Sequence, residues 1–161
     1  MQLSALFVYP VKAARGVRLA STRVTSVGLV HDRRWMIVDA TGRFVSQREV
    51  PALRSLRVTV EGDLVTLTWS GSEAPGVSLS AAPGDALGTR PVTIWEDEVL
   101  AASCGDEADA FLERHLGPGH ALVRLPDEAA RPRTTSHVPD GFHASFADGY
   151  PFLVANEASR R

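Results

Sequence analysis

Residues 56–69 read LRVTVEGDLVTLTW, and this stretch decides the fold class. Apolar and polar residues alternate along both of its halves, which is the period of a strand with one buried face. The positions that share the apolar face are Leu56, Val58 and Val60 in the first half and Val65, Leu67 and Trp69 in the second. Glu61-Gly62-Asp63 between them has the composition of a tight turn. The stretch therefore predicts a β-hairpin that covers an apolar core.

Short apolar stretches on both sides of the hairpin predict further strands. They are residues 3–9, 34–38, 43–45, 77–79, 92–95, 99–102, 122–125 and 150–155. A glycine-containing turn at 39–42 and an acidic turn at 96–98 join two of these pairs. Trp35, Trp69 and Trp95 all lie on predicted strands, so we expect each to be a core residue rather than an exposed stacking surface.

Residues 106–116 predict the one clear helix. Asp106 and Glu107 open it, where negative charge suits the helix dipole, and Gly117-Pro118 ends it. Residues 70–88, apart from a short edge strand at 77–79, and residues 126–146 predict loops. Residues 156–159 look like the start of a second helix. Together the elements predict a mainly β or α+β fold, a β-barrel-like domain with hairpins and one helix.

Composition narrows the class of protein. The chain has 161 residues, 44% hydrophobic and 22% charged, which is ordinary globular composition with room for one domain or one domain and part of a second. Its formal charge of -2 gives no global field for nucleic acid or an anionic membrane surface. There is no apolar run long enough for a transmembrane helix, and a single cysteine excludes an intrachain disulfide. We expect a cytoplasmic protein.

Basic residues gather at strand ends and in loops, where binding groups usually lie. The candidates are Lys12, Arg15, Arg33, Arg34, Arg48, Arg131 and Arg133. If two or three of them converge, they form a site for a phosphate or another small anion. The alternative is solvated surface charge. Lys12 is the only lysine of the chain, which reflects either a general use of arginine or a specific need for an ammonium group.

Cys104 has two interpretations. It lies at the predicted helix start, where a thiol pKa can be lowered, so a catalytic or metal-binding role is one of them. The favoured one is a small buried hydrophobic residue, because no second cysteine or nearby histidine supports a site. The spacing of the histidines is not that of a zinc site, and we predict no metal ligands in this chain.

Six short motifs, in order along the chain, resemble the MOSC family of molybdenum-cofactor proteins. They are Tyr9-Pro10-Val11-Lys12 with Arg15-Gly16-Val17, Gly28-Leu29 with Asp32-Arg33-Arg34-Trp35, Gly42 with Arg48, Cys104-Gly105-Asp106, Arg131-Pro132-Arg133, and Asp148-Gly149-Tyr150-Pro151-Phe152-Leu153 with Asn156-Glu157-Ala158-Ser159. The resemblance implies an amino-terminal β-barrel domain over residues 1–120 and the start of the MOSC domain over residues 121–161.

The resemblance also implies chemistry. The family uses a molybdenum cofactor (molybdopterin) for two-electron reduction of N-hydroxylated or N-oxygenated compounds. Its motifs carry cofactor binding over to Lys12 and Arg33, with a backbone contact at Ala13, and nominate Asp148 and Gly149 as residues that line the cofactor. Arg15, Arg48, Arg131 and Arg133 are secondary candidates for an anion site.

One departure limits this expectation. The catalytic cysteine of the family follows the Asn-Glu-Ala-Ser motif, and this chain ends there, so we expect no catalytic residue and an inactive short chain. Electrons would come from a separate protein. The alternatives are a non-catalytic module for pterin or small anions, an interaction domain that dimerises through a sheet edge, and, more weakly, pyridoxal phosphate held on Lys12 as a Schiff base.

Overall fold

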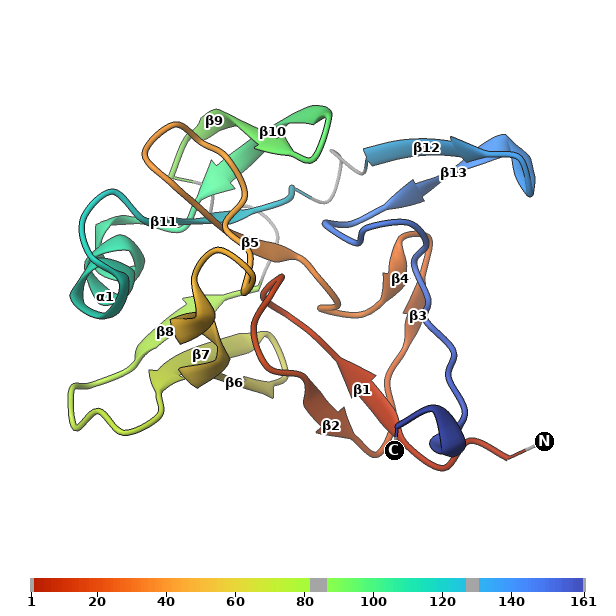
Figure 1. Cartoon of the computed structure of the whole chain (residues 1–161), viewed down its shortest axis with the longest axis horizontal. Helices are drawn as coiled ribbons and strands as arrows, with labels where there is room; N and C mark the ends of the chain where they lie inside the picture. The colour runs from red at the N-terminus through yellow and green to blue at the C-terminus, as the bar shows by residue number, and fades with distance from the viewer. Residues whose placement is uncertain (1, 82–86, 127–130, 161) are drawn as a thin grey trace.

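The computed structural model describes residues 2–81, 87–126 and 131–160. Parts of two predicted loops, residues 82–86 and 127–130, lie outside the described residues. The described elements are mostly short strands with one α-helix, which confirms the predicted fold class (Figure 1). In chain order they are β1 (Leu6–Val8), β2 (Val17–Leu19), β3 (Val24–Thr25), β4 (Gly28–Leu29), β5 (Trp35–Val38), η1 (Pro51–Ser55), β6 (Leu56–Glu61), β7 (Leu64–Trp69), β8 (Val77–Ser80), β9 (Thr89–Ile94), β10 (Asp97–Ser103), α1 (Asp106–Leu116), β11 (Ala121–Arg124), β12 (Arg131–Thr135), β13 (Val138–Ala144) and η2 (Glu157–Arg160). None of the described helices is long and apolar enough to cross a membrane.

The hairpin predicted at residues 56–69 is confirmed as β6 and β7. The strands are antiparallel, with Leu56 opposite Trp69 and Glu61 opposite Leu64, and Gly62 takes the left-handed φ of +61° that the turn requires. The predicted edge strand is confirmed as β8, which pairs with β7. Six side chains of this sheet are buried in one core cluster: Leu56, Val58, Val65, Leu67, Val77 and Leu79.

A second sheet, with strand order β5-β11-β10-β9, divides the interior in two. Trp35 and Ile37 of β5 belong to the core cluster under the hairpin, whereas Met36 and Val38 belong to a second cluster on the opposite face. Because successive side chains of a strand point to opposite faces, β5 is a continuous apolar run buried on both sides. The segment after β5 makes one antiparallel bridge, Val38 with Phe44, and then bonds to Thr93 of β9.

Helix α1 is confirmed at Asp106–Leu116. Ala108, Phe111 and Leu112 are buried, and the helix lies against β8 and β11 (Figure 1). The Asp109 carboxylate accepts a hydrogen bond of 2.8 Å from the backbone N–H of Leu122. This bond ties the helix to β11, an inner strand of the second sheet.

Three predictions for the carboxyl-terminal third were wrong. Much of the predicted loop at 126–146 is a hairpin, β12 and β13, whose strands are polar because much of their surface is exposed. The predicted strand at 150–155 is irregular and mostly exposed, and residues 157–160 form a short 3-10 turn instead of an α-helix. Apolar composition alone does not make a strand, because the ladder needs a partner strand and none of the described strands pairs with this segment.

Candidate functional site

Three segments that are far apart in the sequence converge around Lys12. The backbone N–H of Arg33 donates to Tyr9 O at 2.8 Å, and that of Lys12 donates to Trp35 O at 2.8 Å. The N–H of Phe146 donates to the carbonyl of Arg33 at 2.9 Å, which brings in the third segment. The structure therefore gathers residues 9–12, 33–35 and 146–148 at one place, which we call the Lys12 site.

The ammonium group of Lys12 is almost enclosed. Its side chain is 7% exposed, and Nζ donates to the carbonyl of Phe146 at 2.8 Å and to the carboxylate of Asp148. The rings of Phe44 and Trp95 lie 4.7 and 5.8 Å from Nζ, within the range of cation–π attraction. Burial lowers the pKa of Lys12, and the hydrogen bond and charge of Asp148 oppose that shift.

Asp148 is the exposed partner of this pair. Its side chain is 71% exposed, and Trp95 Nε1 donates to the same carboxylate oxygen at 2.8 Å. Partial burial opposes ionisation of Asp148, but the hydrogen bonds from Lys12 and Trp95 outweigh it and lower the pKa of the carboxyl group. Asp148 is thus ionised at neutral pH and neutralises Lys12. Next to it, Gly149 faces open space, where an added Cβ would meet no atom within 4 Å.

Arg33 lies beside this pair with a carboxylate of its own. Its guanidinium group pairs with Asp32 and lies 5.1 Å from the centre of the Tyr9 ring. Asp32 is buried and accepts the backbone N–H of Tyr9 at 2.7 Å. Burial raises the pKa of Asp32, and the bond from Tyr9 and the charge of Arg33 oppose that shift.

The backbone around the site adopts unfavourable conformations. Among the described residues, four that are not glycine have a positive φ, and three of these surround Lys12: Ala13 at 65°, Arg33 at 50° and Trp95 at 57°. The fourth, His31, lies two residues before Arg33. Such conformations cost about 1–3 kcal/mol each and gather at functional sites, where the surrounding structure enforces them. At Ala13 the surrounding structure includes the Gln47 side-chain amide, which donates a hydrogen bond of 2.6 Å to the Ala13 carbonyl.

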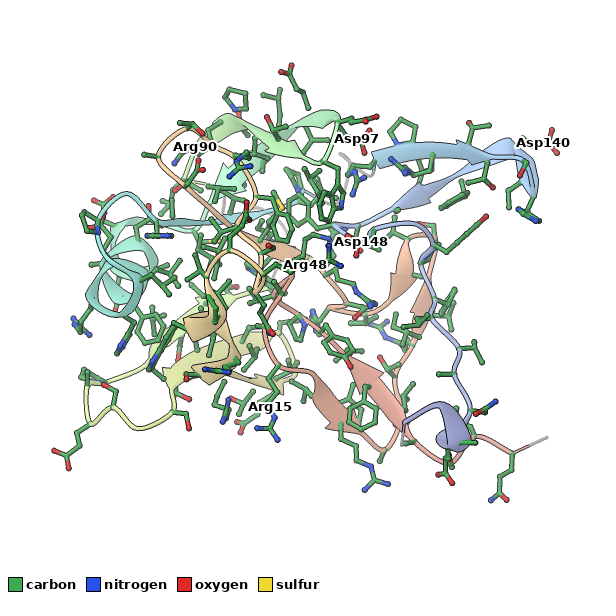
Figure 2. All side chains as sticks on the ribbon, in the orientation of Figure 1. Arg15, Arg48, Arg90, Asp97, Asp140 and Asp148 are labelled. Carbon is green, nitrogen blue, oxygen red and sulfur yellow. The ribbon has the colours of Figure 1, made fainter. Side chains whose placement is uncertain are left out.

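Two of the four secondary arginine candidates, Arg131 and Arg133, converge on one carboxylate, that of Asp97. Arg131 is 2% exposed, and its guanidinium group donates to the carbonyls of Ser145 and Ala147 and to the carboxylate of Asp97. Arg133 donates to the same Asp97 carboxylate at 2.7 Å. Arg15 and Arg48 are exposed, and Arg15 lies well apart from Asp148 in Figure 2. Through its hydrogen bonds, Arg131 therefore holds in place the backbone of residues 145–147, which leads to the Lys12 site.

Trp95 is the residue that sequence reasoning missed. The pattern predicts a core position, but Trp95 occupies the turn between β9 and β10 and its side chain is 55% exposed. Its ring packs edge-on against Phe44, with centroids 5.6 Å apart. The turn begins at Trp95, one residue earlier than predicted, and this shift turns the indole out of the sheet and toward Asp148.

A cavity of about 450 Å³ adjoins Arg33. Its walls are residues 3–7 and 151–157, most of them apolar, and Tyr9, Asp32 and Arg33 line it as well. Arg33 therefore lies between the Lys12 site and this cavity.

Cys104 is partly buried and packs against the core cluster under the hairpin, in keeping with the favoured structural interpretation. Burial raises the pKa of its thiol to about 12, so the thiolate that would attack a substrate or bind a metal ion is scarce at neutral pH. Within the described ranges, no group of three or more His, Cys, Asp or Glu side chains is placed to hold a metal ion.

We expect Cys104 to resist thiol reagents in the folded chain. At about pH 8 a disulfide reagent should modify the native protein far more slowly than the protein unfolded in urea, because only the unfolded chain offers a normal thiolate. Release of the coloured thiol product measures both rates. Equal rates in the two states would show that the thiol is open and reactive.

Comparison with known proteins places this geometry in context. The model for the MOSC N-terminal beta barrel domain matches residues 1–118. Mitochondrial amidoxime-reducing component 1 of Homo sapiens is 27% identical over 96% of this chain and 48% of its own length. The molybdenum cofactor sulfurase of Danio rerio is 33% identical over 80% of this chain and 16% of its own length. A Bordetella bronchiseptica protein of known solution structure shares the fold, with a TM-score of 0.55 and 15% identity over 74% of this chain and 98% of its own.

Proposed function

The chain belongs to the MOSC N-terminal beta barrel domain family, and from this premise we propose that its Lys12 site anchors the anionic part of a molybdenum cofactor. The chain spans about half the length of the amidoxime-reducing relatives and less of the sulfurases. The names of these two groups of relatives refer to different reactions. Because both groups match this chain, we attribute to it a function that the two reactions can share, which is holding the cofactor.

The observation that carries the proposal is the enclosed Lys12 ammonium with an exposed anionic partner. A phosphate group needs a cation that the fold holds in place and whose current partner can leave. Lys12 is 7% exposed, whereas Asp148 is 71% exposed, so the cation is fixed and its carboxylate can move into solvent. Arg33 adds a planar guanidinium group that suits phosphate and carboxylate oxygens. These donors fit the phosphate-bearing pterin portion of the cofactor, and the Ala13 backbone, Asp148 and Gly149 would line it.

The described residues fit the metal less well than the pterin. Molybdenum prefers a soft ligand such as a thiolate, and the raised thiol pKa of Cys104 argues against that role. When bound, the cofactor would supply two-electron redox chemistry. We propose reduction of N-oxygenated compounds as the reaction, with a separate protein as the electron donor. The part of Lys12 and Arg33 in it is to bind and orient the cofactor, and we propose that these residues alone give binding without turnover.

Dimerisation of the chain and attachment of pyridoxal phosphate to Lys12 stay predictions. Neither has a specific contact in its favour among the described residues. The Lys12 amine is already paired with Asp148 and Phe146 O, which makes a free nucleophilic amine less available for a Schiff base. Anchoring of an anion uses the same amine in its charged form, and the observed pairing with a carboxylate favours that form.

The single lysine allows a direct test of the site. We expect inorganic pyrophosphate to slow acetylation of Lys12. A bound anion would shield the amine and keep it protonated, and only the neutral amine reacts with the ester. The measurement is peptide mass spectrometry after timed exposure to an amine-reactive ester. An Arg18→Lys variant supplies the control, since position 18 is exposed on β2 and should be acetylated at the same rate with or without the anion. Equal rates at position 12 with and without pyrophosphate would reject an anion site there.

A further inference from the structure

We propose that Asp148 is an internal competitor for the Lys12 site: its carboxylate occupies the anion position on Lys12, Trp95 orients it there, and an incoming anion must displace it. The inference rests on the proposed function, because it assigns to that same site the residues that determine which anions enter. It makes Asp148 a specificity-determining residue and Trp95 a positioning residue.

The four neighbours of Lys12 Nζ differ in how freely they can move. Phe146 O cannot leave, because the Phe146 N–H is bonded to Arg33 O and Arg131 holds the carbonyls on both sides, those of Ser145 and Ala147. Phe44 is buried in the second core cluster. Trp95 and Asp148 both reach solvent, and Asp148 is the more exposed of the two, with 71% of its side chain in solvent against an exposure of 55% for Trp95. An anion that approaches Lys12 therefore reaches the position of this carboxylate.

A hydrogen bond from Trp95 fixes the carboxylate of Asp148. The indole N–H donates to the Asp148 oxygen that also accepts from Lys12, at 2.8 Å, so two donors orient one oxygen. Trp95 holds this position from a turn residue with φ of +57°, which a residue other than glycine seldom adopts. Its ring also packs against Phe44. The indole N–H of this exposed tryptophan in a strained turn is thus bonded to the carboxylate that competes for Lys12.

Displacement of Asp148 would uncover positive charge. Arg33 and Arg131 are near enough to Lys12 to act on its charge, and both push the pKa of Lys12 down. Arg33 pairs with Asp32, and Arg131 shares the Asp97 carboxylate with Arg133. Without Asp148 the site would carry an excess of positive charge.

The consequence is selectivity for anions of high charge. A monocarboxylate such as acetate can only replace Asp148 one for one, and it loses because Asp148 is tethered at high effective concentration. A phosphate or pyrophosphate group brings more charge and more acceptor oxygens, so it can bind Lys12 and also engage Arg33. The site should therefore favour phosphoryl groups over simple carboxylates.

The test is calorimetric titration of the full chain with pyrophosphate at low ionic strength, where charge interactions are least screened. Because an exposed ion pair contributes little, Asp148→Asn should tighten binding only about three- to fivefold. Trp95→Phe keeps the ring but loses the N–H donor, and it should tighten binding by a smaller factor. The double variant should match Asp148→Asn alone, since without the carboxylate Trp95 has nothing to orient.

Matched controls are present in the chain. Asp140→Asn removes an exposed carboxylate from the outer end of the β12–β13 hairpin (Figure 2), and Trp69→Phe removes an indole that stacks on His115. Both should bind pyrophosphate like the wild type, and circular dichroism checks the fold of every variant. If the wild type binds pyrophosphate clearly and Asp148→Asn binds it with the same affinity, Asp148 is not a competitor for the site, and the proposed function stands. No saturable binding by any variant would overturn both.

Discussion

Replacing Lys12 with methionine is expected to weaken pyrophosphate binding about 30- to 100-fold. Methionine keeps most of the aliphatic length that packs against Phe44 but has no charge and no donor. A charge-assisted hydrogen bond is worth roughly 1.5–3 kcal/mol, and each 1.4 kcal/mol is about tenfold in affinity. Because the side chain is enclosed, water cannot replace the lost ammonium group as it would at the surface.

The same titration measures this variant, with Arg18→Met as its control. Arg18 lies on β2 and is exposed, so its loss removes one positive charge from the chain without touching the Lys12 site. We expect that variant to bind within about twofold of the wild type, because the high dielectric constant of water weakens the interaction of an exposed charge with a distant anion. If the two variants lost affinity equally, the binding would reflect net charge rather than a site.

Replacing Arg131 with methionine is expected to lower the free energy of unfolding by about 3 kcal/mol. The guanidinium group is 2% exposed and bonds to two backbone carbonyls and to Asp97. Its removal takes a donor from all three acceptors, of which Asp97 keeps the bond from Arg133. Breaking a buried ion pair from one side costs about 3–5 kcal/mol, and the partial exposure of Asp97 places this case at the lower end. The same change should loosen the 145–147 backbone beside Lys12.

Urea unfolding followed by circular dichroism measures this loss, and Arg133→Met is the matched control. Arg133 pairs with the same Asp97 carboxylate, but its side chain is 31% exposed. Its loss should cost less than about 1 kcal/mol, as for other solvated pairs. Equal destabilisation by the two variants would mean that the contacts of Arg131 with Ser145 O and Ala147 O contribute nothing.

The parts of the fold that sequence predicted are those whose signal is local. The alternation in residues 56–69 encodes its own partner strand and turn, and α1 has its dipole charges and its stop signal within or beside it. The β12–β13 hairpin has no apolar alternation, because much of its surface is exposed, and its polarity resembles that of a loop. Residues 150–155 show the reverse case, an apolar stretch without a strand partner among the described residues.

The candidate site shows the same division. Resemblance to the MOSC family nominated Lys12, Arg33 and Asp148, and the structure brings these three together, while their role as cofactor ligands stays a prediction. What sequence could not predict is which groups pair across the site. The contact between Lys12 and Asp148 spans 136 positions, and that between Trp95 and Asp148 spans 53. Such pairs follow from the tertiary arrangement of three segments, not from any local pattern.

Uptake of the molybdenum cofactor by the purified chain tests the role of the Lys12 site most directly. The chain is titrated with molybdopterin cofactor, excess cofactor is removed by gel filtration, and bound molybdenum and pterin fluorescence are measured for the wild type, Lys12→Met and Arg33→Met. We expect saturable binding by the wild type and loss of binding in both variants, with the fold retained. Cofactor uptake that is unchanged in both variants, or absent in the wild type, would contradict a cofactor-anchoring site at Lys12.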